Sequence, residues 1–155
     1  MGRALAAVGG LLVLCFAILG VAIFITREED RVAVDQVLAE DIARAITLND
    51  NAPDPLELDV VTKFDWDELL VVAPDTPFER ISEALGFEFK GDLRYDAESQ
   101  ELFVFVRNGR LARFADYRGR GTFEGLERPV DRFTPETARF SVQRLRIAPA
   151  PPPAG

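Results

Sequence analysis

The hydrophobic pattern is most regular in residues 100–117, where two runs of β-branched and aromatic residues flank Asn108-Gly109. This dipeptide readily takes positive φ at both central positions of a type I′ turn, so the pattern predicts a β-hairpin with a two-residue turn. The first run, Leu102–Val106, is apolar throughout and has no polar face. We expect it to form a strand inside a sheet that is covered on both sides.

A two-residue turn determines the register of the predicted hairpin, because directly opposed residues share one face of a sheet. We expect Val106 to lie opposite Leu111, and Phe103 to lie opposite Phe114. One face of the hairpin would then carry Phe103, Phe105, Ala112 and Phe114, and the other would carry Leu102, Val104, Val106 and Leu111.

Two further segments place apolar residues at the spacing of an amphipathic helix. The first, Arg31–Leu48, either extends from a membrane segment as a stalk or folds back onto the sheet, and the proline-containing stretch Asn49–Pro55 ends it. In the second, Thr76 is expected as the N-cap and Pro77 as the first helical residue. Gly86 is expected to end this second helix.

The other segments of the soluble part are predicted to be strands. Leu69–Ala73 is an apolar run typical of a buried strand, and Leu56–Thr62 is expected to be a short edge strand. Residues 87–95 alternate around Gly91 and are expected to form a three-stranded meander with the hairpin. In Arg139–Ile147 the apolar side changes partway, which predicts a bulge or a strand that leaves the sheet.

Together these elements predict an α+β fold, in which an N-terminal transmembrane helix precedes a small, mostly antiparallel sheet of four or five strands with one or two packed helices. We divide the chain into a transmembrane anchor (1–26), a helical stalk and linker (27–55), a globular domain (56–147) and a disordered proline-rich tail (148–155).

The predicted anchor, Ala4–Thr26, contains no charged residue. As a helix it would be about 35 Å long, enough to cross a hydrocarbon core of roughly 30 Å. Its length and the lack of a cleavage site favour a retained single-pass anchor over a cleaved signal peptide. Positive charges nearly balance across it, and we expect the C-terminal domain to be extracytoplasmic. Gly2, Ala6 and Gly10 form a stripe of small residues that would allow a weak homodimer through the membrane helix.

Composition excludes several kinds of site. The chain has no His and one Cys, Cys15, which lies in the apolar segment, so disulfides, Cys/His zinc sites and Ser-His nucleophiles are excluded. We expect no enzymatic activity, no cofactor, no metal and no nucleic-acid partner. The net charge is −8, but residues 27–101 hold 21 acidic and 7 basic residues, whereas residues 102–155 hold 5 acidic and 10 basic ones.

The basic half supplies the candidate binding residues. The guanidinium groups expected to form an anion-binding or partner-binding face are those of Arg107, Arg110, Arg113, Arg118 and Arg120. Their partner would be an acidic protein segment or anionic lipid head groups. The alternative interpretation is that these arginines neutralise the acidic first half of the chain within the fold.

Asp65 and Asp67 are the candidate catalytic pair of an alternative hypothesis. They are two residues apart, so on a strand both would point the same way at a separation of roughly 7 Å. Such a pair, with Trp66 as a platform for a sugar, would suit glycoside hydrolysis. The same residues are typical of ordinary solvated charges at the entrance of a strand, with Trp66 in the core. We favour this second interpretation, because no other motif completes an active site.

Three short motifs resemble a loosely defined group of small bacterial envelope proteins with an N-terminal membrane segment or lipid anchor. They are Phe64-Asp65-Trp66-Asp67, Pro74 with Thr76-Pro77 before a helix that ends in Ala84-Leu85-Gly86, and Phe103-Val104-Phe105 before a turn. The resemblance implies an anchored extracytoplasmic domain and no known activity. We therefore expect a membrane-anchored, non-enzymatic interaction or accessory domain of the bacterial envelope. The alternatives are a cytoplasm-facing domain that regulates or docks on anionic lipid, and a hydrolase that uses Asp65 and Asp67.

Overall fold

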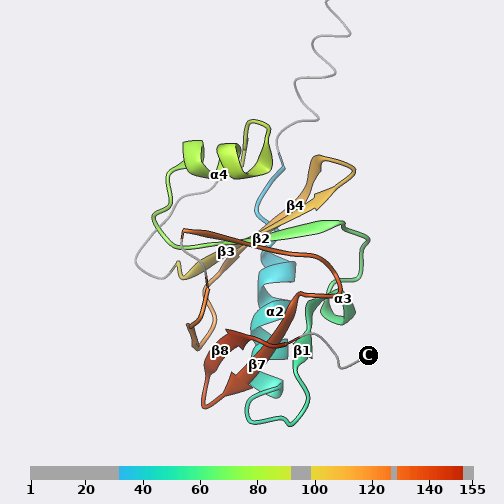
Figure 1. The fold of residues 1–155 in the computed structure, drawn as a ribbon, viewed down its shortest axis with the longest axis vertical. Coiled ribbons are helices and arrows are strands. Elements are labelled where there is room, and N and C mark those ends of the chain that lie inside the picture. The colour runs from blue at the N-terminus through green and yellow to red at the C-terminus, as the bar shows by residue number, and fades with distance from the viewer. Residues whose placement is uncertain (1–31, 92–98, 127–128, 152–155) are drawn as a thin grey trace, which may run out of the picture. The chain divides into compact units, whose positions relative to one another are not determined.

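Two four-stranded sheets carry the fold of the residues that the computed structural model describes, which are 32–91, 99–126 and 129–151 (Figure 1). In chain order, the elements within these ranges are α2 (Gln36–Leu48), β1 (Leu56–Glu57), α3 (Leu58–Val61), β2 (Glu68–Val72), α4 (Phe78–Leu85), β3 (Glu101–Arg107), β4 (Arg110–Tyr117), β5 (Thr122–Phe123), β6 (Val130–Phe133), β7 (Arg139–Gln143) and β8 (Arg146–Pro149). The predicted α+β class is confirmed, but the strands form two sheets where we expected one.

The two longest strands, β3 and β4, belong to the central sheet, in which the order is β4-β3-β2-β6 and all neighbours are antiparallel. The second sheet has the order β1-β7-β8-β5, and its pairs are antiparallel except that β5 runs parallel to β8. Among the described helices, none has the length and apolar character needed to cross a bilayer. The predicted anchor lies outside the described residues.

The strand β3 is buried on both faces, as predicted. On one face, Phe103 and Phe105 belong to a core that also contains residues of α2 and of the second sheet. On the other face, Val104 packs in a separate cluster with Ile81 of α4 and with Phe89. The central sheet is therefore the middle layer between two apolar clusters.

The turn of the β3–β4 hairpin is as predicted, whereas its register is not. Asn108 and Gly109 have φ of 51° and 69°. Arg107 lies opposite Arg110 and Val106 opposite Leu111, but the register then shifts between Phe105 and Val106. Ala112 is the extra residue, and it forms a β-bulge that shifts the rest of β4 by one position.

The bulge decides which side chains of β4 are buried. Without it, Arg113 would lie opposite Val104, whose face of the sheet is apolar, and burying an unpaired guanidinium there would be costly. With it, Arg113 lies opposite Phe105 and Phe114 lies opposite Val104. The Phe114 ring then packs edge-on against the Phe89 ring, with 5.3 Å between the two ring centroids. The expectation that Phe114 shares a face with Phe103 was wrong for this reason.

The helix α2 folds back onto the sheets, so the packing alternative holds and the stalk alternative does not. Asp35 caps its first turn, because its Oδ1 accepts a hydrogen bond from the Leu38 N–H at 2.9 Å. Leu38, Ile42 and Ile46 recur on one side and are buried in the core. The compact unit accordingly runs from Val32 and includes residues that we had assigned to a stalk and linker.

The helix α4 ends as predicted and begins differently. Gly86 takes the left-handed conformation with φ of 76° at its C-terminus. At the N-terminus, Pro77 occupies the cap position and makes no side-chain hydrogen bond. The Thr76 hydroxyl instead donates to the Ala73 carbonyl at 2.6 Å, within the turn that follows β2. Thr76 is therefore a turn residue, and the prediction that it is the N-cap was wrong.

The predicted meander does not form in the described part of residues 87–95. No strand is present at 87–91, where Phe89 instead packs into the cluster around α4, and residues 93 and 95 lie outside the described ranges. β2 pairs directly with β3. The predicted strand Leu56–Thr62 is reduced to the two residues of β1, after which the chain turns into α3.

The segment predicted as one bulged strand is a second hairpin, β7–β8. Its turn residues, Arg144 and Leu145, have φ of 53° and 60°, values that L-residues other than Asn and Asp rarely adopt. The loop after α2 holds this turn in place, because the Leu145 N–H donates to Asp50 Oδ1 at 2.9 Å and the Arg144 N–H donates to Asn51 Oδ1 at 3.2 Å. β8 continues to Pro149, into the segment that we expected to be a tail.

Candidate functional site

The first two candidate arginines, Arg107 and Arg110, flank the β3–β4 turn directly opposite each other. Arg107 forms an ion pair with Asp65, with 2.9 Å between Arg107 Nη2 and Asp65 Oδ2. Arg110 is exposed and has no ion-pair partner within the described ranges. Asp65 therefore offsets the like-charge repulsion at the turn by neutralising one of the two arginines.

The third candidate, Arg113, is part of a contact that joins β4 to the start of α2. Its Nη1 lies 3.0 Å from Asp35 Oδ2, and its guanidinium carbon lies 4.5 Å from the centre of the Phe64 ring. The Asp35 N–H also donates to the Phe114 carbonyl at 2.9 Å. Arg113 thus has a structural role, in which an ion pair and a cation–π contact act together.

The last two candidates, Arg118 and Arg120, follow the end of β4 that is opposite the turn. They differ in their side-chain contacts. Arg118 donates from Nε to Oδ2 of Asp116 at 2.7 Å, and this carboxylate is buried. Arg120 has no side-chain ion pair in the described part of the chain, but its carbonyl accepts a hydrogen bond from the Tyr117 hydroxyl at 2.7 Å. Burial raises the pKa of Tyr117 to about 12.

The five candidate arginines do not gather into one site. Arg110 and Tyr117 are the two ends of β4, and an eight-residue strand is roughly 24 Å long, so the two groups of arginines are separated by about that distance. Other arginines of the basic half pair with acids of the first half, as Arg132 does with Glu68 and Arg139 with Glu57. These pairs agree with internal neutralisation, and a shared anion-binding face stays a prediction.

The candidate catalytic pair is engaged in holding the hairpin. Asp65 bridges to Arg107, and Asp67 Oδ2 accepts the N–H of Asn108 in the turn. Trp66 is 6% exposed, and its Nε1 donates to the Thr62 hydroxyl at 2.8 Å. Its ring packs edge-on against Phe105 rather than forming an open platform. No group of three His, Cys, Asp or Glu side chains in the described ranges is placed to hold a metal ion.

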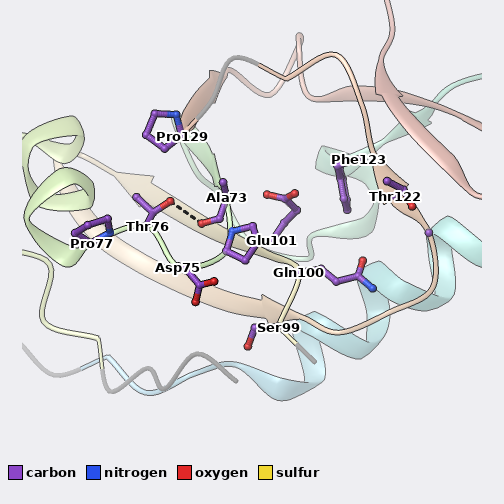
Figure 2. A pocket seen from close by; sticks show the side chains of 12 residues that line it. Ala73, Asp75, Thr76, Pro77, Ser99, Gln100, Glu101, Thr122, Phe123 and Pro129 are labelled. Atoms are coloured by element: carbon purple, nitrogen blue, oxygen red, sulfur yellow. Dashed lines mark hydrogen bonds between the residues drawn. The ribbon is translucent and has the colours of Figure 1, made fainter. Parts of the chain in front are cut away.

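A pocket of about 690 Å³ lies where the turn after β2 meets the start of β3 and the β5 segment. Glu101, which is 4% exposed, and Phe123 contribute to its wall, and Asp75 and Thr122 are exposed at its rim. Figure 2 shows Glu101 pointing to the same side of the turn as Phe123 and Pro129, whereas Asp75 and Ser99 point to the other side.

The backbone around this pocket is unusually constrained. Asp75 has a φ of 60°, and the Thr76 hydroxyl closes the same turn on Ala73 (Figure 2). Gly121 has a φ of 123°, and a Cβ there would lie 2.8 Å from Ile147 Cδ1 and 2.9 Å from the Leu145 carbonyl oxygen. Only glycine fits at this corner.

Sequence reasoning missed the pocket because its residues come from four separate parts of the chain, near positions 75, 100, 122 and 129. The available signals were Pro74-Asp75, which favours a turn, and the glycines of the 118–121 corner. Neither indicates that these turns meet.

Comparison with known proteins adds no further assignment. No family model matches the chain, and neither a curated protein nor a solved structure matches it.

Proposed function

We propose that this chain is a membrane-anchored, non-enzymatic interaction domain of the bacterial envelope, and that it binds its partner at the pocket around Asp75 and Thr122. The observation that carries the proposal is the pocket itself. Its volume of about 690 Å³ is within the range of roughly 300 to 1,000 Å³ that is usual for ligand sites. Its lining combines apolar side chains such as Phe123 and Pro129 with polar ones such as Glu101, and ligand sites usually contain both kinds.

The roles of the acidic residues support the non-enzymatic part of the proposal. Asp65 and Asp67 are the carboxylates that best suited hydrolysis, and both hold the β3–β4 turn. Trp66 is packed in the core. These contacts give all three residues a structural function that needs no substrate.

The membrane part of the proposal is supported by the sequence alone, through the apolar segment Ala4–Thr26. Intact mass of the protein extracted from membranes should include the residues before Arg27. A soluble product that begins near Thr26 would contradict the anchor. Reporter fusions at the C-terminus, active on one side of the membrane only, would establish the side on which the domain lies.

The pocket is tested by site-specific crosslinking in native membranes. A photoreactive residue in place of Asp75 should capture a discrete partner. Thr122→Trp, which adds a ring at the opposite rim, should abolish that product. The matched control is Val60→Trp on α3, which adds the same ring at a position that is 73% exposed and outside the pocket. Equal capture in both variants would exclude the pocket as the binding site.

A further inference from the structure

The solvent-facing side of α2 carries a stripe of four residues that no helix or strand of the described ranges covers. The stripe consists of Val37, Asp41, Arg44 and Leu48. Val37 is 69% exposed and Leu48 is 79% exposed, and they are among the most exposed large apolar side chains in the described ranges. The spacing of four, three and four residues places all four side chains within roughly 60° of the helix circumference.

The order of side chains in the α2 stripe is complementary to itself when a second copy is turned end to end. Along the helix it is apolar, acidic, basic and apolar, and the spacing is the same from either end. In an antiparallel pair, Val37 of one copy faces Leu48 of the other, and Asp41 faces Arg44. In a parallel pair, Asp41 would face Asp41 and Arg44 would face Arg44, so like charges would oppose each other.

We propose that two copies of this chain form a dimer by antiparallel packing of their α2 stripes. A two-fold axis at the middle of the stripe makes the interface isologous, so the Val37–Leu48 contact and the Asp41–Arg44 ion pair each form twice. The spacing of three and four residues is that of two helices that pack along their length.

The contacts within one copy leave this stripe available. Asp41 and Arg44 approach each other only to 3.9 Å, and the Arg44 side chain is 70% exposed. An exposed pair of this kind contributes little, roughly 0 to 1 kcal/mol. Exchanging it for two ion pairs across the interface therefore costs almost nothing.

The size of the stripe determines how strong the dimer is. The stripe has four residues over three helical turns, roughly 16 Å, whereas a stable complex usually buries about 800 Å² per partner with roughly 20 to 30 residues on each side. The dimer should therefore be weak in dilute solution. Anchoring both copies in one membrane, which rests on the proposed function, raises their effective concentration and favours the pair.

Cysteine crosslinking of the full chain in native membranes tests the geometry, in a Cys15→Ser background. Two differently tagged copies, one with Val37→Cys and the other with Leu48→Cys, should form a mixed disulfide-linked dimer on oxidation. Val37→Cys expressed alone should not crosslink to itself. Self-crosslinking of Val37→Cys would overturn the antiparallel arrangement, and no crosslink in the mixture would overturn the dimer.

Charge exchange tests the complementarity in the same crosslinking assay. Asp41→Arg in both copies should reduce the mixed crosslink roughly tenfold, because each introduced guanidinium then faces that of Arg44 in the other copy. Asp41→Arg in one copy with Arg44→Asp in the other restores opposite charges and should restore the crosslink. Arg80→Asp, an exposed charge reversal on α4, is the control and should have no effect. Equal crosslinking in all combinations would overturn the proposed pairing.

The two proposals fail in different ways. If the anchor is absent, the intact mass will lack the residues before Arg27, while the mixed crosslink will still form when the soluble protein is concentrated. If the α2 stripe is not an interface, the protein will remain in the membrane and no mixed crosslink will form there.

Discussion

Arg118 and Asp116 are two residues apart at the end of β4, and a terminal nitrogen of the guanidinium lies 2.6 Å from the carboxylate. The Asp116 side chain is 5% exposed and that of Arg118 is 40% exposed. Ser99 also donates to the same oxygen, Oδ2, while Oδ1 is buried with no hydrogen-bond partner in the described part of the chain. Arg118 is therefore the counter-ion of a carboxylate that water hardly reaches.

Arg118→Gln should destabilise the protein, because it leaves the Asp116 carboxylate buried without its cation. Removing one partner of a fully buried pair costs about 3 to 5 kcal/mol, and the exposure of Arg118 lowers the expected loss to about 1 to 3 kcal/mol. Arg120→Gln, whose side chain has no ion pair in the described ranges, should leave the free energy of unfolding nearly unchanged. Urea denaturation of both variants measures the difference, and equal stabilities would show that the Asp116 pair is unimportant.

The two carboxylate oxygens of Asp35 make separate contacts, one with the first turn of α2 and the other with Arg113 of β4. Two substitutions distinguish these contacts. Asp35→Asn retains a capping oxygen for the Leu38 N–H and loses the charge that faces Arg113. Asp35→Ala loses both, and the missing cap should cost about 1 kcal/mol more. Thermal or urea unfolding should thus rank the parent above the asparagine variant and the asparagine variant above the alanine variant. If Asp35→Ala and Asp35→Asn unfold together, Asp35 is not the cap of α2.

Arg144→Asn should stabilise the protein, which is an unusual outcome for a single substitution. Arg144 has a φ of 53°, and asparagine adopts the left-handed conformation more readily than arginine. The gain should be about 0.5 to 1 kcal/mol, part of the roughly 1 to 2 kcal/mol that such a conformation costs an ordinary residue. Gln143→Asn, in the adjacent strand position, is the control and should give no gain. A lower urea midpoint for Arg144→Asn would mean that the side chain of Arg144 stabilises the turn.

Stability should fall at alkaline pH because of Tyr117. Burial raises its pKa from 10.0 to about 12, so between these values the unfolded chain releases the phenolic proton while the folded protein retains it. The stabilisation is complete below pH 10 and is lost as the pH rises through about 12. Tyr117→Phe removes this contribution, so its free energy of unfolding should decline less steeply across the window. Parallel curves for parent and variant would contradict the assignment.

The parts of the fold that were predictable are those determined by neighbouring residues. Asn108-Gly109 marks its own turn, the run Leu102–Val106 indicates a strand buried on both faces, and Gly86 ends α4. The register of the hairpin was not predictable from its turn, because the bulge at Ala112 depends on which face of the sheet accepts Arg113. That face is decided by Asp35 and Phe64, which are distant in sequence.

The β7–β8 turn was even less predictable from neighbouring residues than the register of the first hairpin. Arg144-Leu145 carries no turn signal, and its partners Asp50 and Asn51 precede it by more than 90 residues. The pocket was likewise invisible, because turns near Asp75, Gln100 and Thr122 meet only in the folded chain. Of the five candidate arginines, the sequence showed the opposition of Arg107 and Arg110 but not the acids that pair with Arg107, Arg113 and Arg118.

The hydrogen bonds between the loop after α2 and the β7–β8 turn join segments that are far apart in the chain. They therefore also affect the order in which the parts of the protein can fold during synthesis. The β3–β4 hairpin can form as soon as Tyr117 is available, because β2 and β4, the two partners of β3, have been made by then. The second sheet cannot, because β1 and β5 have no partners until β7 and β8 have been made. The nascent chain should therefore carry a formed hairpin beside an unpaired β1 until β7 and β8 have been translated. Arrested chains that end before and after β8 should differ abruptly in resistance to protease.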